Sequence, residues 1–111
     1  RETDPLPSAR GARRRVRVLL AAQVVAFVRR LPPEPKGRLR RALRDLAKQR
    51  GDIKALEAPL EAYCRLRVGG YRIVFSYGPR RTIECIFAER RSVVYELLLE
   101  RLRDRLRGAA D

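Results

Sequence analysis

The feature that most constrains the fold is a glycine pair at residues 69 and 70, with alternating apolar and polar residues on both sides. A period of two is typical of a β-strand that is buried on one face, and a two-residue glycine loop is typical of a tight hairpin. The sequence therefore predicts strands over residues 63–68 and 71–77. The short loop also sets the register, which pairs Val68 with Tyr71 and Arg67 with Arg72.

This register divides the hairpin side chains between two faces. The core face is apolar and carries Cys64, Leu66, Ile73 and Phe75. The opposite face, called the cationic face below, carries Tyr63, Arg65, Arg67, Arg72, Val74 and Ser76.

The cationic face places Arg67 directly opposite Arg72, a like-charge pair that destabilises a sheet on its own. An anion between the two guanidinium groups reverses the sign of that interaction. The alternative is that both side chains extend into water or pair with an acidic side chain such as Glu84. Because Arg65 lies on the same face and residues 90–91 add two arginines at the far end of the sheet, we favour an anion site.

Glu84 itself has two interpretations. If a third strand pairs Phe75 with Cys85, Glu84 lies beside Ser76 on the cationic face. It then acts as a general base or as a structural counter-ion, and we favour the counter-ion.

The remaining elements follow from periodicity and helix-breaking residues. Residues 16–20 suit a short strand, and helical spacing over 24–31 ends at Pro32 and Pro33. A second helix begins near Pro35 and ends before Gly51, a third strand covers 82–88, and a last helix follows Ser92. The predicted fold is α+β: a short N-terminal strand and a helical hairpin packed on an antiparallel sheet of three to four strands, followed by a C-terminal helix, with the helices on one face of the sheet. Residues 1–14 are expected to be a mobile basic arm, and residues 15–107 one domain.

The charge of the chain points to a polyanionic partner. It has 27 Lys and Arg against 13 Asp and Glu, a net charge of +14 at pH 7, and arginine supplies most of the cations. Such an excess in 111 residues indicates nucleic acid, an acidic protein or both. No apolar run reaches the length of a membrane span, and no signal-peptide core is evident, so we expect a cytoplasmic protein without a membrane partner.

Histidine and cysteine usage limits the chemistry. With no His and two Cys, the usual zinc ligand sets are excluded, and we expect neither metal nor cofactor. Cys64 and Cys85 are expected to point into the core with one strand between them, roughly 9–10 Å apart, which exceeds the ~7 Å Cα limit for a disulfide. Both are predicted to be buried thiols, consistent with a reducing compartment.

Residues 63–75 (YCRLRVGGYRIVF) and 87–95 (FAERRSVVY) resemble two motifs of the RelE/ParE superfamily of bacterial toxins, and the resemblance extends over roughly residues 16–100. It implies a toxin that an acidic antitoxin neutralises. In the RelE branch it implies cleavage of mRNA on the ribosome, by attack of a ribose 2′-hydroxyl on the adjacent phosphate.

The resemblance also implies roles for individual residues. Arg65 and Arg67 match the paired basic residues of the second strand, and Arg72 matches the arginine proposed to stabilise the transition-state phosphate. Arg91 matches the arginine of the closing motif, and Tyr95 matches the aromatic residue that stacks on or activates the nucleotide. Tyr63 and Arg90 complete the predicted site as substrate contacts, and Arg90 stands where many relatives carry histidine.

Two other functions remain open at this point. The ParE branch implies a toxin that inhibits DNA gyrase without cutting RNA, and Arg72 does not distinguish the branches. Arg65 with Arg67, and Tyr95 at the start of the last helix, favour the nuclease. A non-catalytic basic nucleic-acid-binding module is the third function; it predicts sequence-blind, salt-dependent binding without cleavage.

Overall fold

The computed structural model describes residues 16–110 of the chain, and the side chains of residues 16–104. The arm predicted for residues 1–14 lies outside the described residues. The elements, in chain order, are β1 (Arg17–Leu20), α1 (Ala22–Arg30), α2 (Pro33–Leu46), β2 (Asp52–Ala55), β3 (Cys64–Val68), β4 (Tyr71–Gly78), β5 (Thr82–Arg90) and α3 (Val94–Ala110). The fold is α+β, as predicted.

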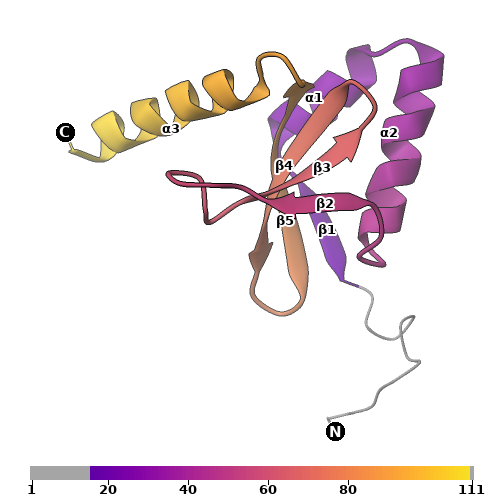
Figure 1. Ribbon diagram of the computed structural model, residues 1–111, viewed down its shortest axis with the longest axis horizontal. Coiled ribbons are helices and arrows are strands. Elements are labelled where there is room, and N and C mark those ends of the chain that lie inside the picture. The colour runs from indigo at the N-terminus through magenta and orange to yellow at the C-terminus, as the bar shows by residue number, and fades with distance from the viewer. Residues whose placement is uncertain (1–15, 111) are drawn as a thin grey trace, which may run out of the picture.

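The sheet has five strands in the order β1-β5-β4-β3-β2 (Figure 1). It is mixed, because β1 runs parallel to β5 while the other neighbours are antiparallel. The prediction of an antiparallel sheet of three to four strands was therefore wrong in strand number and in the direction of β1. The missed strand, β2, is four residues long and lacks the apolar run that indicated β1, since only Ile53 of it packs against the core.

The register of the β3–β4 hairpin is the one predicted. Val68 pairs with Tyr71 and Arg67 with Arg72, and Gly69 takes the positive φ of 58° that the tight turn requires. The predicted pairs of Phe75 with Cys85 and of Ser76 with Glu84 are also present. Between them and the pair Val74–Phe87, β5 contains a bulge at Ile86. Because a bulge reverses the alternation, Phe87 faces the same side as Val74 although Cys85 faces the core.

Helices α1 and α2 cover the core face. The main cluster of buried side chains joins Val24, Phe27 and Leu39 of these helices to Leu66, Ile73, Phe75, Ile83 and Cys85 of the sheet. Beyond Leu20, β1 no longer pairs with β5, and the Gln23 side chain takes its place. Gln23 donates to the Ala88 carbonyl at 2.7 Å and accepts from the Ala88 amide at 2.8 Å, so the edge of β5 stays hydrogen-bonded.

Helix α3 packs on the opposite face of the sheet, contrary to the prediction that all helices share one face. A second cluster lies beneath it: Leu60, Val74, Phe87, Val94 and Leu98. The β5 bulge makes this cluster possible, because it turns Phe87 toward α3. Figure 1 shows α3 extending from the end of β5 past the sheet, so that it covers only part of the cationic face.

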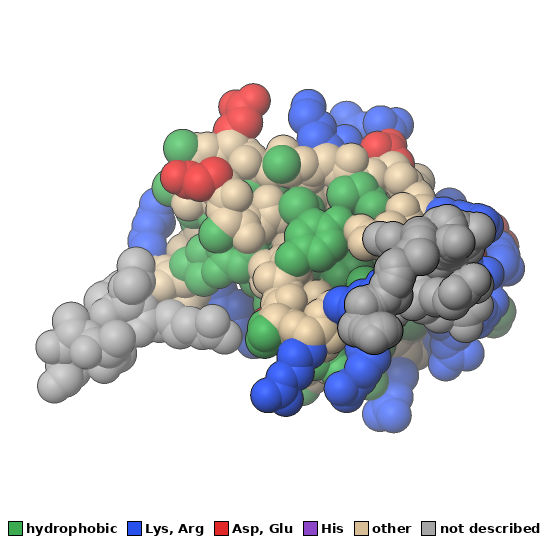
Figure 2. Space-filling view, turned by 90° about the horizontal axis from the view of Figure 1, so that it is seen from below, with side chains coloured by type: hydrophobic (Ala, Val, Ile, Leu, Met, Phe, Trp, Pro, Cys, Tyr) green, Lys and Arg blue, Asp and Glu red, His purple; other side chains and the backbone are tan. Residues whose placement is uncertain are grey.

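One end of the molecule exposes hydrophobic side chains. Seen from below, they gather in several patches near the middle, with basic side chains along the lower margin and both acidic and basic ones along the upper margin (Figure 2). Exposed large apolar side chains of β1 and β4 are Leu19, Leu20 and Tyr77. Among the described residues, no helix is long and apolar enough to cross a membrane.

Candidate active site

Arg72 is the centre of the cationic face. It lies in β4 between Arg67 of β3 and Glu89 of β5, and only 8% of it is exposed. Its Nη1 donates to the carbonyl oxygens of Gly69 at 2.8 Å and Tyr71 at 2.9 Å. Its Nε and Nη2 bond to no atom within the described part of the chain. The hairpin thus fixes the guanidinium group and leaves donors free for a ligand.

The electrostatics of Arg72 identify its neighbours. Its pKa is lowered from the ordinary value, first because burial disfavours the charged form and then because Arg67 is close. Arg65 and Arg91 lower this pKa further, whereas Tyr95 acts in the opposite direction. All five residues predicted to be catalytic are therefore close enough to interact. An anion bound among these cations would relieve the unfavourable interaction.

A second like-charge pair lies beside the first. Lys54 of β2 pairs directly with Arg65 of β3, as Arg67 pairs with Arg72. Lys54 was not among the predicted site residues, because β2 was not predicted. Two adjacent like-charge pairs across three strands strengthen the case for an anion site, since each is unfavourable without a counter-charge.

Asp52 of β2 is the acidic partner of this face. Arg65 Nη1 lies 2.8 Å from the Asp52 carbonyl oxygen and 3.2 Å from Oδ1, and Arg67 Nε lies 3.9 Å from Oδ2. Glu84, proposed as a counter-ion, lies beside Ser76, four residues along β4 from Arg72 or about 13 Å. The counter-ion is therefore Asp52, which stands opposite Arg67 in the register, contacts Arg65 as well, and neutralises only part of the charge.

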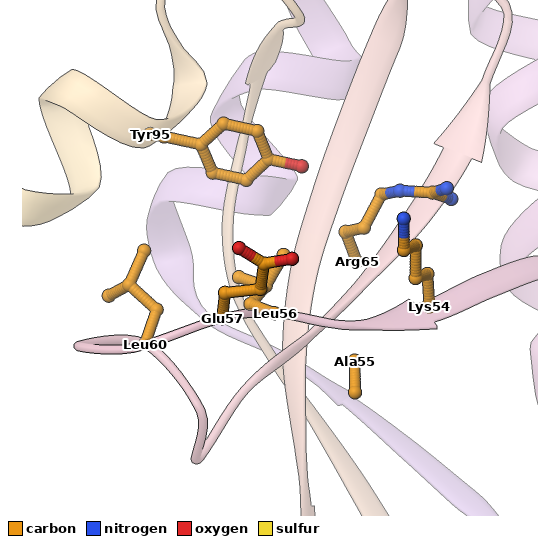
Figure 3. A pocket seen from close by; sticks show the side chains of 7 residues that line it. All are labelled: Lys54, Ala55, Leu56, Glu57, Leu60, Arg65 and Tyr95. Carbon is orange, nitrogen blue, oxygen red and sulfur yellow. The ribbon is translucent and has the colours of Figure 1, made fainter.

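A cavity of about 330 Å³ opens between α3, β2 and the loop before β3 (Figure 3). Arg65 and Tyr95 of the predicted site line it, together with Lys54, Leu56, Glu57 and Leu60. The Tyr95 ring lies on the opposite side of the cavity from Glu57 and Leu60. The cavity joins the cationic cluster to an aromatic ring, an arrangement that suits a nucleotide with its phosphate and its base.

The other predicted residues lie less centrally. Arg91 follows β5 directly, is exposed, and donates its backbone amide to Gly70 at 2.9 Å. Tyr63 precedes β3 and packs, half-buried, against the cluster beneath α3. Arg90 ends β5 and is exposed, and strand alternation from Ala88 puts it on the core-face side of the sheet, away from Arg72.

Both cysteines are free, as predicted. Cys64 is half-buried and Cys85 is buried, and they stand on β3 and β5 with Phe75 of β4 between them. Burial raises the pKa of Cys64 and raises that of Cys85 to about 12. Neither thiol is a nucleophile at neutral pH.

Solved toxin structures share this fold. The RelBE2 toxin–antitoxin complex from Mycobacterium tuberculosis matches with a TM-score of 0.61 and 20% identity, over 69% of this chain and 99% of that one. The RelE–RelB complex from Pyrococcus horikoshii matches with a TM-score of 0.56 and 25% identity, over 68% and 94%. A YoeB/ParE toxin from Agrobacterium tumefaciens matches with a TM-score of 0.54 and 14% identity, over 68% and 98%.

No protein-family model matches the sequence, and no curated protein matches it significantly. The likeness therefore rests on three-dimensional structure. The chain has the RelE/ParE toxin fold, which confirms the resemblance found in its hairpin and closing motifs.

Proposed function

We propose that this protein is the toxin of a toxin–antitoxin pair and that it is an endoribonuclease acting on ribosome-bound mRNA in the cytoplasm. Support comes from the fold, from the net charge of +14 and from the arginine cluster on the cationic face. The observation that carries the nuclease proposal is Arg72, a nearly buried guanidinium oriented by two backbone carbonyls and surrounded by further cations.

The chemistry follows from these residue types. The ribose 2′-oxygen attacks the adjacent phosphorus, the bond from phosphorus to the 5′-oxygen breaks, and a 2′,3′-cyclic phosphate and a 5′-hydroxyl end result. Negative charge builds on the phosphate oxygens in the transition state, where Arg72, Arg67 and Arg65 stabilise it. Arginine stays protonated and cannot act as a base. The 2′-hydroxyl proton leaves to water, and the Tyr95 phenol donates a proton to the departing 5′-oxygen and regains one from water. Most of the rate enhancement comes from electrostatics and positioning.

The expected protein partner is an acidic antitoxin. The matched structures from Mycobacterium tuberculosis, Pyrococcus horikoshii and Methanococcus jannaschii are complexes of RelE-type toxins with antitoxins. A chain with this charge attracts an acidic segment, and exposed apolar side chains such as Leu19, Leu20 and Tyr77 offer it hydrophobic contacts.

The test is cleavage in a translating extract, with mapping of 5′-hydroxyl mRNA ends against the reading frame. The wild-type protein is expected to cut in frame, and Arg72→Ala to reduce the rate by about 10²–10³-fold. Arg44→Ala, which removes an exposed arginine from α2, is the matched control and should cut normally. Undiminished cleavage by Arg72→Ala would overturn the assignment of this residue. Intact mRNA together with gyrase-dependent DNA breaks would instead identify a gyrase inhibitor.

A further inference from the structure

The cavity beside Tyr95 contains a carboxylate that the nuclease chemistry does not use. Glu57 lines it, and its side chain makes no hydrogen bond or ion pair with any described residue. In Figure 3 the carboxylate points into the space below the Tyr95 ring. Lys54 and Arg65, which pair with one another across β2 and β3, line the same cavity.

The position of Glu57 is set by the backbone of its loop. The Leu60 amide donates to the Glu57 carbonyl at 2.8 Å, and the Leu56 amide donates to the Tyr63 carbonyl at 3.0 Å. Leu60 is buried in the cluster beneath α3, which anchors the loop to the sheet. The turn that carries Glu57 is thus fixed to the sheet, while the Glu57 side chain itself is exposed at the mouth of the cavity.

A carboxylate at this place repels a phosphate, so its contribution to binding an RNA must come from another part of the nucleotide. Carboxylates only accept hydrogen bonds, and the donors of a nucleotide lie on its base and its sugar hydroxyls. A cavity of about 330 Å³ is at the small end of ligand pockets, a size that suits one base and its sugar.

We propose that this cavity is a base-recognition subsite and that Glu57 selects guanine. Guanine presents two adjacent donors on its Watson–Crick edge, N1–H and the N2 amino group, which match the two carboxylate oxygens. Adenine and cytosine present one amino donor beside an acceptor nitrogen, and uracil one N–H between two carbonyls, so each pairs with the carboxylate through one bond only.

The other cavity residues fit the same orientation. With N1 and N2 of guanine on Glu57, its O6 acceptor lies next to them, where the Lys54 ammonium can donate to it. Tyr95 provides a ring and Leu56 and Leu60 provide apolar surface for the two sides of the base. The attached phosphate then extends toward Arg65 and, beyond it, Arg67 and Arg72.

The biological role of this subsite rests on the proposed nuclease function. Nucleotide binding by the subsite does not, because it can be measured without cleavage. NMR titration of the full chain with guanosine, inosine, adenosine and cytidine 3′-monophosphates gives four affinities. Guanosine 3′-monophosphate is expected to bind about tenfold more tightly than the inosine form, which lacks only the N2 amino group. In Glu57→Gln this ratio should fall below about twofold, because an amide offers a single acceptor oxygen.

Glu61→Gln is the matched control, since Glu61 is exposed in the same loop but does not line the cavity. It should keep the guanosine preference. Arg72→Ala should weaken all four nucleotides alike and leave their ratios unchanged. Equal affinities for the four nucleotides in the wild-type protein, or a preference that survives Glu57→Gln, would overturn the proposal.

Cleavage mapping separates this inference from the nuclease proposal. If the wild-type protein cuts mRNA next to guanine and Glu57→Gln loses about tenfold of that preference, both stand. If it cuts without any base preference, the nuclease stands and the guanine subsite is overturned. If the nucleotide titration shows the guanosine preference but mRNA stays intact, the subsite stands and the nuclease is overturned.

Discussion

The two faces of the sheet differ in the charge they carry: one is apolar and buried, and the other is cationic and partly exposed. The core face lies beneath α1 and α2 and buries Leu66, Ile73, Phe75, Ile83 and Cys85. The cationic face is covered only in part, by α3, and its uncovered part collects arginines and a lysine. Because side chains alternate along a strand, β3 and β4 supply both faces from consecutive residues. A single hairpin therefore contributes to stability on one side and to the candidate site on the other.

The fold tolerates the like-charge pairs of the cationic face because burial on the core face outweighs them. Each like-charge cross-strand pair destabilises the sheet by up to about 1 kcal/mol. Burial of a large aliphatic or aromatic side chain on the core face contributes about 1.5–3 kcal/mol. The pairs Arg67–Arg72 and Lys54–Arg65 thus destabilise the protein by much less than the buried side chains of the core face stabilise it. The fold therefore tolerates both pairs even without a bound anion.

The largest expected effects test whether the two faces contribute unequally to stability. Leu39 of α2 and Leu98 of α3 are both buried, one in each cluster. Leu39→Ala is expected to lower the free energy of unfolding by about 4 kcal/mol and Leu98→Ala by about 2 kcal/mol. The difference arises because the cluster beneath α3 is smaller and can close around the missing atoms. Urea denaturation measures both values.

Leu98→Ala has a second consequence that Leu39→Ala lacks. Leu98 is three residues from Tyr95 on α3, so loosening the packing of α3 should displace the tyrosine and lower nuclease activity. At a temperature where both variants remain folded, Leu39→Ala should keep its activity. Equal losses of stability, or equal losses of activity, would show that the two faces do not divide their roles in this way.

What could be predicted from the sequence was local. The hairpin, its register, the division of its faces and the pairing of Phe75 with Cys85 followed from alternation around Gly69 and Gly70. Strand β2 could not be predicted, because its four residues lack an apolar run and its stability comes from pairing with β3. Asp52 and Lys54 of β2, both on the cationic face, were therefore not predicted either.

The placement of α3 was the second miss. Its apolar stripe predicts an amphipathic helix but does not say which sheet face it covers. The bulge at Ile86 decides this by turning Phe87 toward the cationic face, and a bulge leaves little trace in a single sequence. The five residues expected to be catalytic do lie together, whereas Glu57 had no motif to reveal it.

A smaller effect tests whether the core face excludes charge. Burial raises the pKa of Cys85 to about 12 from its usual 9.0, so the folded protein keeps the thiol neutral over a range where the unfolded chain ionises it. This contribution to stability is complete below pH 9 and is lost as the pH rises from 9 toward 12. At about pH 10.5 the loss from this group should reach about 2 kcal/mol.

Cys85→Ala should flatten this decline, although the variant starts from a lower stability because of the atoms it removes. Cys64→Ala should flatten it less, since Cys64 is only half-buried. Unfolding free energies measured by urea at a series of pH values give both slopes. An unchanged slope in Cys85→Ala would mean that water reaches this part of the core face.

The smallest effect on stability concerns Asp52, the acid of the cationic face that forms ion pairs with Arg65 and Arg67. Asp52→Asn removes the counter-charge of Arg65 and Arg67, whose pairs with it are partly exposed, so stability should fall by less than about 1 kcal/mol. Affinity for RNA should instead rise. If Arg67 then contacts a phosphate, the plot of log affinity against log salt concentration becomes steeper by about 0.7 for a single strand. An RNA with 2′-O-methyl groups, which cannot be cleaved, allows the measurement.

Glu34→Gln is the control, because it removes the same charge from an ion pair with Arg38 on α2, the helix that covers the core face. Both variants raise the net charge by one, so a general effect of charge changes both slopes equally. If only Asp52→Asn makes the plot of log affinity against log salt concentration steeper, the phosphate contacts lie on the cationic face. Asp52 then lowers the affinity of the wild-type protein for RNA. Equal slopes would mean that RNA contacts arginines over the whole surface, and that the two faces of the sheet differ in packing but not in recognition.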